Sequence, residues 1–298
     1  MITRAVPRGA RPAGAAPRGR RPGTPYTPGV PAARPAAPSP PDPSSVAAAA
    51  RILDRARSIL FVTGAGISAD SGLPTYRGVG GLYEAETTEE GLPIEVLLSG
   101  ETFLRRPEWT WKYLGAIERA CRGALPNRAH EAIAALGAER PRVVVLTQNV
   151  DGLHRAAGSR DVIEIHGDVH DLACTRCAWR ATVPDYDGLE LPPRCPACTS
   201  LVRPAVVLFG EMLPHPAVAR LEEELRRGFD AVVSVGTTSV FPYVAAPVLM
   251  ARGWGAGSIE VNPGDTEVSD VVDVRIRCGA AVALEAVLAS LRRRDDFR

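Results

Sequence analysis

The sequence predicts an α/β protein in which a parallel β-sheet, covered by helices on both faces, is interrupted by a small metal-binding module. Short runs rich in Val, Ile and Leu alternate with stretches of helical periodicity, a pattern typical of buried parallel strands. Two C-x-x-C pairs separate two of these runs and have the spacing of a zinc module. At 298 residues the chain can hold one large domain or two modest ones.

The predicted strands and helices follow one another along the chain. Apolar runs predict strands at residues 58–63, 142–146, 162–165, 205–209, 231–235 and 258–261. Helical periodicity predicts helices at residues 46–57, 94–98, 101–104, 108–121, 127–136, 214–228, 242–252 and 280–294. Within residues 108–121, apolar residues recur at helical spacing at Trp109, Trp111, Leu114, Ile117 and Cys121. We therefore expect the two tryptophans to pack in a core. Polar and glycine residues follow the strand ends, the edge at which open α/β sheets bind ligands.

A glycine-rich turn after the first predicted strand is the centre of the predicted site. Gly64, Gly66 and Ala69 fit the G-x-G-x-x-G/A pattern, in which backbone N–H groups approach a dinucleotide phosphate. The alternative is a tight turn without a ligand, because glycine is also common there. Residues 72–81 are too rich in glycine for a helix and are typical of a mobile loop that closes over a ligand.

Composition narrows the possible function classes. The hydrophobic fraction is 45%, and no apolar run approaches the ~18 residues of a membrane span. The formal net charge is +1, but residues 1–45 hold seven arginines and one acidic residue, which leaves 28 basic and 33 acidic residues in the remainder. A mildly acidic folded part argues against a nucleic-acid binder, which usually carries a basic face.

Residues 1–45 contain twelve prolines and few large apolar residues, so we expect a disordered tail. Such a segment cannot bury enough surface to offset the entropy lost on folding. One alternative is an arginine-rich arm that contacts anionic partners. A targeting peptide is a second, although prolines break the segment and it is not amphipathic. A misassigned start codon is the third.

Cys174, Cys177, Cys195 and Cys198 form the two C-x-x-C pairs, with seventeen residues between the inner cysteines. This spacing predicts two zinc knuckles joined by a hairpin. Four thiolates leave no position open for water, so the zinc ion would be structural and not catalytic. Because no export signal precedes the cysteines, we expect metal ligands in place of disulfides and a reducing cytoplasm as the compartment.

Seven motifs extend over most of the chain. They read GAGISADSGLPTYRG (64–78), TQNVDGLH (147–154), HGD (166–168), the two C-x-x-C pairs, VVLFGE (206–211), GTT (236–238) and VNPGDT (261–266). In this order they resemble the sirtuins, the NAD-dependent protein-lysine deacylases, across about residues 46–290. The resemblance implies that NAD and an acyl-lysine protein react to give nicotinamide, O-acyl-ADP-ribose and free lysine.

The resemblance also implies two parts that follow the disordered tail within a catalytic domain of residues 46–298. A Rossmann-like part would comprise residues 46–75, 126–168 and 204–298. A smaller part would combine a helical insertion, residues 76–125, with the zinc ribbon, residues 169–203. NAD and the acyl-lysine would meet in the cleft between them.

Site residues follow from the same resemblance. The residues implied to bind NAD are Gly64, Ala65, Gly66, Ala69, Thr75, Tyr76, Arg77, Gln148, Asn149, Asp151, Gly236, Thr237, Thr238, Asn262, Gly279 and Ala280. The residues implied to form an apolar tunnel and a strand edge for the substrate are Val207, Leu208, Phe209, Gly210 and Glu211. An extended peptide could pair with that edge through its main chain, with little sequence selectivity.

His166, Asn149 and Asp151 are the implied catalytic residues. Breaking the bond to nicotinamide builds positive charge on the ribose, which suits oriented amide and carboxylate groups and a loop that excludes water. His166 would take a proton from a ribose hydroxyl, and imidazole suits this because its pKa lies near working pH. The alternative for His166 is a residue that only caps a strand. The other histidines, expected to be structural or exposed, are His130, His154, His170 and His215.

Three departures from the sirtuin pattern affect the prediction. Tyr76 replaces the usual phenylalanine, and the segment after Gly236 is one residue shorter than the common version. Sirtuins that remove succinyl or malonyl groups carry Tyr-x-x-Arg on the helix that follows a Trp, where Leu114 and Ile117 stand here. We therefore expect weak activity on acidic acyl groups and a preference for acetyl or longer apolar groups.

Two other functions fit the same residues. A protein mono-ADP-ribosyltransferase would cleave NAD at the same site but give ADP-ribose to a protein nucleophile. A non-catalytic NAD-sensing module would bind NAD without turnover, although the set of Asn149, Asp151 and His166 argues against this. The sequence does not identify the substrate protein or the oligomeric state.

Overall fold

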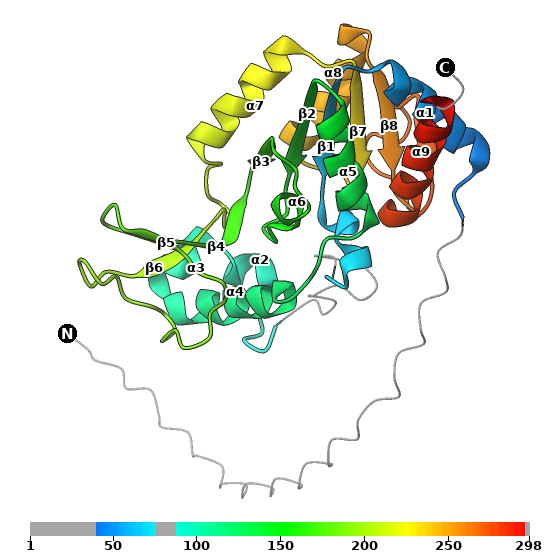
Figure 1. Ribbon diagram of the computed structural model, residues 1–298. Coiled ribbons are helices and arrows are strands. Elements are labelled where there is room, and N and C mark those ends of the chain that lie inside the picture. Colours follow the sequence, from blue (N-terminus) through cyan, green and yellow to red (C-terminus); the bar gives the residue numbers. More distant parts are fainter. Residues whose placement is uncertain (1–39, 75–87, 296–298) are drawn as a thin grey trace, which may run out of the picture. The chain divides into compact units, whose positions relative to one another are not determined.

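The structure is a computed structural model that describes residues 40–74 and 88–295 (Figure 1). The predicted disordered tail at 1–45 and the predicted closing loop at 72–81 therefore lie largely outside the described residues. Within the two described ranges, no helix has both the length and the apolar composition needed to cross a membrane.

A six-stranded sheet, parallel at every pair of neighbours, organises the fold. Its strands are β1 (Ser58–Thr63), β2 (Arg142–Thr147), β3 (Val162–Glu164), β7 (Ala231–Val235), β8 (Gly257–Val261) and β9 (Val274–Ile276). Their spatial order is β3-β2-β1-β7-β8-β9, which confirms a Rossmann-like α/β fold. The order reverses between β1 and β7, and such a switch point is where open α/β sheets bind ligands.

Helices cover both faces of this sheet (Figure 1). The helices of one face are α1 (Pro43–Arg55), α5 (Arg128–Glu139) and α9 (Ala280–Asp295), and those of the other are α7 (His215–Arg227) and α8 (Pro242–Trp254). Side chains of β1 alternate between the two buried clusters, Ile59 and Phe61 facing one and Leu60 and Val62 the other. Burial on both sides explains why this strand is a continuous apolar run.

Local signals determine where two of these helices begin. The Asp42 side chain accepts a hydrogen bond from the Ser45 N–H at 2.9 Å, so α1 begins at Pro43 and not at residue 46 as predicted. Pro43 suits the first helical position because it has no N–H group to leave unpaired. Asn127 caps α5 as predicted, and its side-chain oxygen accepts from the Ala129 N–H at 2.9 Å.

A second sheet has three antiparallel strands in the order β5-β4-β6. They are β5 (Arg180–Thr182), β4 (Gly167–Cys174) and β6 (Val202–Val206). The prediction of a parallel-sheet strand at 205–209 is therefore wrong. Beyond β6, the Phe209 N–H donates to the Leu98 carbonyl at 2.9 Å and the Gly100 N–H donates to the Phe209 carbonyl at 3.1 Å. The prediction failed because an apolar run indicates only that a segment is buried, and not which segments it packs against.

Three helices pack with the small sheet around a third buried cluster. They are α2 (Ile94–Leu97), α3 (Gly100–Arg105) and α4 (Pro107–Cys121). Trp111 is fully buried there, and its indole N–H donates to the Val202 carbonyl of β6 at 3.1 Å. Trp109 is partly buried against the same cluster. The expectation that both tryptophans are core residues is confirmed.

Short helices follow the first two strands of the large sheet. They are the 3₁₀ helices η1 (Ala65–Ile67) and η2 (Ala69–Ser71) after β1, and α6 (Leu153–Ala156) after β2. All three begin within a few residues of a strand's carboxyl end, which places their loops at the edge where the predicted site residues lie.

Candidate active site

The turns after β1 and β7 pack directly against each other at the switch point. The Gly66 N–H donates to the Gly236 carbonyl at 2.8 Å, and the Gly64 N–H donates to the Val235 carbonyl at 3.2 Å. A Cβ on Gly64, Gly66 or Gly236 would lie within 3.0 Å of the facing loop. These glycines therefore permit close contact between the turns after β1 and β7. The sequence analysis predicted close approach to a phosphate and did not predict this contact. The Ala65 N–H has no hydrogen-bond partner among the described residues.

Asn149 and Asp151 follow β2 and share one partner, Ser68, which lies between η1 and η2. The Ser68 hydroxyl donates to Asp151 Oδ2 at 2.7 Å and accepts from Asn149 Nδ2 at 3.1 Å. All three side chains are buried or half-buried. An oriented amide and an oriented carboxylate thus lie next to the switch point, held by a serine that was not predicted as a site residue.

His166 follows β3 and lies at the same edge of the sheet. Its Nδ1 is 3.0 Å from the Gln148 carbonyl oxygen, and its Nε2 is 2.7 Å from the Tyr243 hydroxyl. Because a carbonyl oxygen can only accept, Nδ1 carries the proton in the neutral ring and Nε2 is the acceptor. Burial lowers the pKa of His166 from its ordinary value, and the hydrogen bond to Gln148 opposes this. The arrangement favours a neutral base with Nε2 as its accepting atom.

Residues predicted on the adenosine side of NAD cluster after β7 and β8. Gln148 Nε2 donates to Thr237 Oγ1 at 2.9 Å, and Asn262 Nδ2 donates to the Thr237 carbonyl at 3.1 Å. Thr237 is buried and Thr238 beside it is exposed. Asn262 Oδ1 accepts from the Gly264 N–H at 3.1 Å, so this side chain also shapes its own turn. The structure therefore brings Gln148, Thr237 and Asn262 together.

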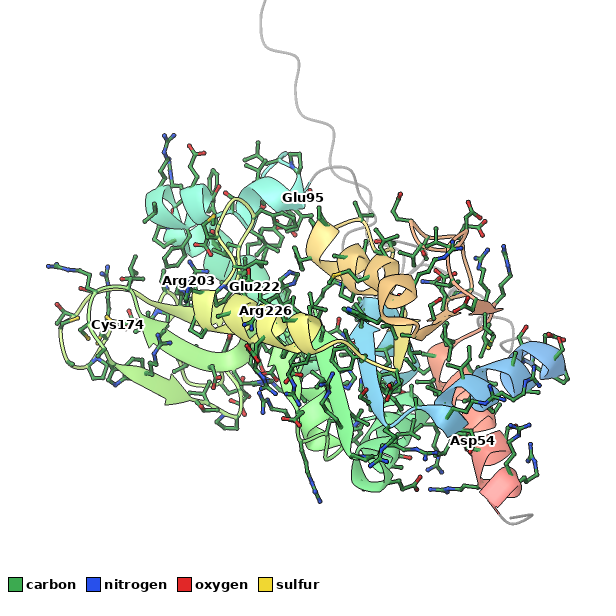
Figure 2. The ribbon with its side chains drawn as sticks, turned by 90° about the horizontal axis from the view of Figure 1, so that it is seen from above. Asp54, Glu95, Cys174, Arg203, Glu222 and Arg226 are labelled. Atoms are coloured by element: carbon green, nitrogen blue, oxygen red, sulfur yellow. The ribbon has the colours of Figure 1, made fainter. Side chains whose placement is uncertain are left out.

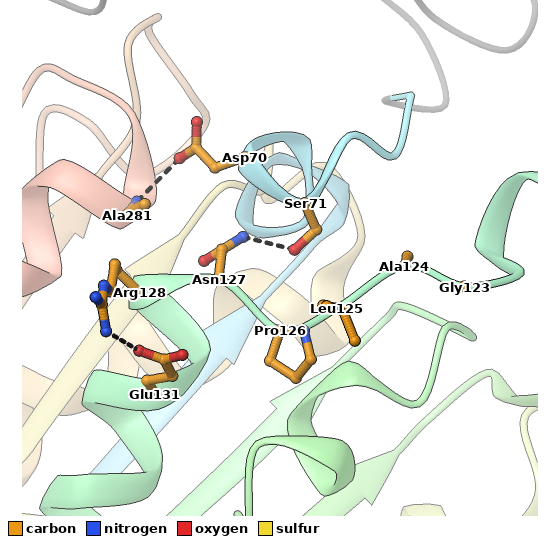
Figure 3. A pocket seen from close by; sticks show the side chains of 10 residues that line it. All are labelled: Asp70, Ser71, Gly123, Ala124, Leu125, Pro126, Asn127, Arg128, Glu131 and Ala281. Atoms are coloured by element: carbon orange, nitrogen blue, oxygen red, sulfur yellow. Dashed lines mark hydrogen bonds and ion pairs between the residues drawn. The ribbon is translucent and has the colours of Figure 1, made fainter.

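Gly279 and Ala280 lie at the start of α9, beside η2. The Asp70 carboxylate accepts from the Ala281 N–H at 3.0 Å, a contact that Figure 3 shows at the rim of a pocket. The loop before α5, which includes Asn127, lines the opposite side of this pocket. Ala281, which follows the two predicted adenine-side residues, lines this pocket, whereas Gly279, Ala280 and His166 do not.

The four cysteines of the C-x-x-C pairs gather at one end of the small sheet (Cys174 in Figure 2). All four Sγ atoms lie within 4.8 Å of one another, Cys174 being 3.4 Å from Cys198 and Cys177 being 3.6 Å from Cys195. None forms a disulfide. Four Zn–S bonds of about 2.3 Å in a tetrahedron give S···S distances of about 3.8 Å. The cluster fits a structural zinc ion.

The predicted substrate segment, residues 207–211, is held by Arg203 of β6 (Figure 2). The Arg203 guanidinium donates to both carboxylate oxygens of Glu211, at 2.5 and 2.9 Å. Glu211 Oε2 also accepts from the Leu208 N–H at 2.9 Å. The carboxylate of Glu211 therefore faces its own loop, so any effect of this residue on a substrate would act through the shape of the segment.

The same segment is connected to the candidate base. The Val207 N–H donates to the His166 carbonyl at 2.9 Å. Leu208 is buried, whereas Phe209 and Gly210 are exposed at the tip of the turn. Residues that a peptide could reach therefore lie within a few positions of a residue bonded to His166.

A known protein family matches the chain over the residues that build this site. The sequence pattern described as the Sir2 family matches residues 64–242, from the glycine turn to the start of α8. The chain belongs to the Sir2 family. A relative in Pseudomonas aeruginosa, named NAD-dependent protein deacylase 2, is 51% identical over 253 residues, which are 84% of this chain and 98% of the relative.

Solved structures of Sir2 proteins have the same fold. A Sir2 homologue in complex with NAD superposes with a TM-score of 0.75 at 34% identity, covering 82% of this chain and 93% of the homologue. A Sir2 protein with a deacetylated p53 peptide and 3′-O-acetyl ADP-ribose has a TM-score of 0.71 at 30% identity, covering 80% of this chain and 96% of its own. The Sir2 fold predicted from the motifs is confirmed.

The sequence analysis missed two residues of the candidate Sir2 site, Ser68 and Tyr243. Ser68 stands inside the glycine-rich motif, and this position within the motif was the available signal. Tyr243 follows the shortened segment, and no pattern in the sequence connects it with His166. Of the predicted NAD-binding residues, Ala69 is exposed at the start of η2. Those outside the described residues are Thr75, Tyr76 and Arg77.

Proposed function

We propose that this Sir2-family chain is an NAD-dependent protein-lysine deacylase that releases nicotinamide, free lysine and O-acyl-ADP-ribose. The observation that carries the proposal is that His166 bonds to the carbonyl of Gln148, the residue before Asn149, while Ser68 after β1 holds the side chains of Asn149 and Asp151 at the same edge of the sheet. The names of the relatives support it, since the first two are NAD-dependent protein deacylases at 51% and 50% identity.

His166, Asn149 and Asp151 are the proposed catalytic residues. NAD, when bound, supplies a ribose carbon from which nicotinamide leaves and to which the acyl oxygen is transferred. Asn149 and Asp151 are fixed by Ser68, so they can stabilise positive charge without reorganising as it develops. His166 can accept the proton of a ribose hydroxyl at Nε2, because Nδ1 already carries a proton directed at Gln148.

NAD binding is assigned to the loops around the switch point. The proposed residues are Gly64, Ala65, Gly66, Ala69, Thr75, Tyr76, Arg77, Gln148, Asn149, Asp151, Gly236, Thr237, Thr238, Asn262, Gly279 and Ala280. The solved complexes of Sir2 homologues with NAD and with ADP-ribose support a nucleotide at this edge. Thr237 and Gln148 provide further support, since their hydrogen bond connects the two halves of the sheet.

An acyl-lysine protein is the proposed substrate, and residues 207–211 are its proposed binding segment. A Sir2 structure that holds a deacetylated peptide supports a protein partner of this class. The exposed tip at Phe209 and Gly210 is accessible to an extended chain. An apolar peptide contact there would leave the Arg203–Glu211 ion pair intact.

We further propose a division into a Rossmann-like part (46–75, 126–168 and 204–298) and a small part (76–125 and 169–203). The three buried clusters support it, because the third consists mostly of residues of the helical insertion and the zinc ribbon, joined by Val150, Val206 and Leu208 of the Rossmann-like part. Zinc would stabilise the small part without acting on the substrate. The free thiols of its cysteines fit a reducing cytoplasm, the proposed location.

One assay tests the function. The purified full chain is incubated with NAD and a panel of acyl-lysine peptides, and the products are identified by mass. We expect free lysine peptide, nicotinamide and O-acyl-ADP-ribose in equal amounts. His166→Ala should lower their formation at least about 100-fold, the lower range for removal of a general base.

The same assay separates the alternatives. Transfer of ADP-ribose to the protein, with the acyl group still on lysine, would identify a mono-ADP-ribosyltransferase. Binding of NAD without nicotinamide release, unaltered by His166→Ala, would identify a non-catalytic NAD-sensing module. Either result would contradict the proposed deacylase.

A further inference from the structure

Tyr243, in the first turn of α8, contacts the imidazole of His166 and has no role in the chemistry described so far. Its hydroxyl oxygen lies 2.7 Å from Nε2, and the two rings meet edge to face with centroids 6.0 Å apart. Phe241 stacks on the tyrosine ring with the centroids 5.6 Å apart. The phenol therefore contacts both an aromatic ring and the atom that would accept the substrate proton.

The direction of this hydrogen bond follows from the other ring nitrogen. Nδ1 faces the Gln148 carbonyl, so it donates, and Nε2 of the neutral imidazole has only a lone pair. The Tyr243 hydroxyl must then donate to Nε2. Burial raises the pKa of Tyr243 to about 12, so the phenol keeps its proton at working pH.

A closed set of contacts holds Tyr243 at this place. Gln148, which accepts from His166, donates through Nε2 to Thr237 Oγ1, and the same oxygen accepts from the Ser239 N–H at 3.2 Å. Ser239 is buried with φ of 58°, a left-handed conformation that a residue other than glycine adopts only when its surroundings impose it. Tyr243 follows Ser239 by four residues, and its hydroxyl contacts His166, so the series of contacts begins and ends at the same imidazole.

Charged side chains near His166 are engaged elsewhere. Asp151 accepts from Ser68 and from the Leu153 N–H, and Asp168 accepts from the N–H and the ring of His170. Among the described residues, the groups hydrogen-bonded to the His166 ring are the Gln148 carbonyl and the Tyr243 hydroxyl. The state of the ring in the ligand-free protein therefore depends on these two partners.

We propose that Tyr243 is a positioning residue for His166, whose hydroxyl donates to Nε2 of the Nδ1–H tautomer, holds the ring in place and covers Nε2 until the reacting ribose hydroxyl takes its place. This rests on the proposed deacylase function and adds a residue to it. The substrate hydroxyl forms the hydrogen bond to Nε2 that the phenol gives up, so one bond replaces another. The base is thus kept neutral, oriented and covered before the substrates arrive.

Tyr243→Phe tests the proposal by ¹⁵N NMR of the histidine rings in the ligand-free full chain. His166→Asn assigns the signal among the five histidines. We expect wild type to show the Nδ1–H tautomer with a hydrogen bond to Nε2. In Tyr243→Phe the Nδ1–H tautomer should remain, because Gln148 still accepts from Nδ1, but the Nε2 signal should lose the shift that the hydrogen bond causes. The pKa of His166 should rise by about half a unit to one unit, since a donor to the neutral ring is lost.

Tyr186→Phe is the matched control, because the Tyr186 hydroxyl donates to the Val169 carbonyl in the third buried cluster. It should leave the His166 signal as in wild type. The pH at which kcat/KM of Tyr243→Phe falls to half should lie about half a unit to one unit above that of wild type, because this profile reports the base of the ligand-free enzyme. Thermal unfolding checks that each variant is folded.

An unchanged Nε2 signal and an unchanged pKa of His166 in Tyr243→Phe would overturn the proposal. A loss of deacylation above about 100-fold would also overturn it, since the phenol would then take part in the proton transfer itself. Failure of the deacylase proposal is recognised separately. In that case wild type would form no O-acyl-ADP-ribose, while the NMR titration, which uses no substrate, would still report on the contact.

Discussion

Gly236 has no side chain because the facing loop leaves no space for one. Its φ is +60°, in the left-handed region, and a Cβ would lie within 3.0 Å of the backbone of Gly66 and Ile67. Backbone atoms cannot rotate aside as a long side chain can. We expect Gly236→Ala to lower the free energy of unfolding by roughly 2 to 4 kcal/mol, from the left-handed conformation and the overlap together. Urea denaturation followed by circular dichroism measures this.

Gly253 provides the matched control for Gly236. It lies in α8, where a Cβ would meet nothing within 4 Å. Gly253→Ala should leave the free energy of unfolding unchanged or raise it by up to about 1 kcal/mol, because alanine is the better helix former. If the two substitutions had equal effects, contact between the loops would not be the reason for Gly236.

Sequence patterns predicted which residues meet at this edge of the sheet, but they did not predict which residues would be hydrogen-bonded or packed against one another. The G-x-G pattern at Gly64 and Gly66 predicted a close approach of backbone, and a close approach is present. The approaching group, however, is Gly236, which lies far along the chain and within a different motif. Ser68 was missed for a similar reason, because a serine in a glycine-rich turn is typical of turns in general. Its two partners follow another strand.

At the scale of elements, a partly buried ion pair fixes the segment after β6. The side chains of Arg203 and Glu211 are 16% and 29% exposed. Burial raises the pKa of Glu211, but hydrogen bonds from Arg203 and from the Leu208 N–H outweigh it, so the pKa lies below its ordinary value of 4.5. Folding therefore stabilises the charged form. This contribution is fully present above pH 4.5 and is lost as the pH falls through the folded-state pKa.

We expect Glu211→Gln to lower the free energy of unfolding at pH 7 by roughly 1 to 3 kcal/mol, because Arg203 loses its charged partner in a partly buried place. The difference from wild type should shrink when the pH falls below 4.5, where the wild-type carboxylate takes up a proton. Urea denaturation at pH 7 and at pH 4 measures both values.

Glu223→Gln is the control for the ion pair. Glu223 pairs with Arg226 of α7, which Figure 2 labels, and the side chains of Glu223 and Arg226 are 52% and 70% exposed. Its loss should cost about 0 to 0.5 kcal/mol at pH 7. A loss of stability in Glu211→Gln that did not change with pH would indicate that the shape of the carboxylate, and not its charge, holds the segment.

Helix α4 carries the two positions that bear on the acyl group. Leu114 is buried and Ile117 is partly buried, both in the third cluster. A succinyl carboxylate would meet neither a hydroxyl nor a guanidinium from these side chains. We expect kcat/KM on a succinyl-lysine peptide to be at least about 30-fold below that on the acetyl-lysine peptide, about 2 kcal/mol for a poorly paired carboxylate. Comparable values on two peptides of one sequence would contradict this.

Strands that are buried on both faces could be predicted from the sequence, whereas strands and loops that are buried on one side could not. β1 and β7 appear at the predicted residues because strands buried on both faces are continuous apolar runs. The run from Val206 to Phe209 has the same composition, yet Val206 ends the antiparallel strand β6 and Phe209 pairs with Ser99, directly before α3. β9 is three residues long and alternates apolar with polar residues, so it gave no such run. The composition of an apolar run therefore indicates that the run is buried, but not which segment its backbone pairs with.

At the scale of the whole molecule, two strands connect the cysteine cluster with the catalytic edge. β4 begins directly after His166 and ends at Cys174, and β6 ends at Val206, where the substrate segment starts. On one side the small sheet is supported by the third buried cluster, to which α2, α3 and α4 contribute. Zinc would add to that support at the cysteine end, since the binding free energy of a structural zinc ion adds to the free energy of folding.

We expect Cys177→Ser to lose the zinc ion and to lower deacylation at least about 100-fold, because β4 and β6 would no longer hold His166 and the substrate segment in place. Zinc content is measured by mass spectrometry. Trp111, buried against Val202 of β6, should shift its fluorescence to longer wavelength, whereas the two clusters of the large sheet should keep most of the far-UV signal. Cys121→Ser, outside the cluster, should keep zinc and activity. Full activity in a zinc-free Cys177→Ser protein would show that the module and the catalytic edge are independent.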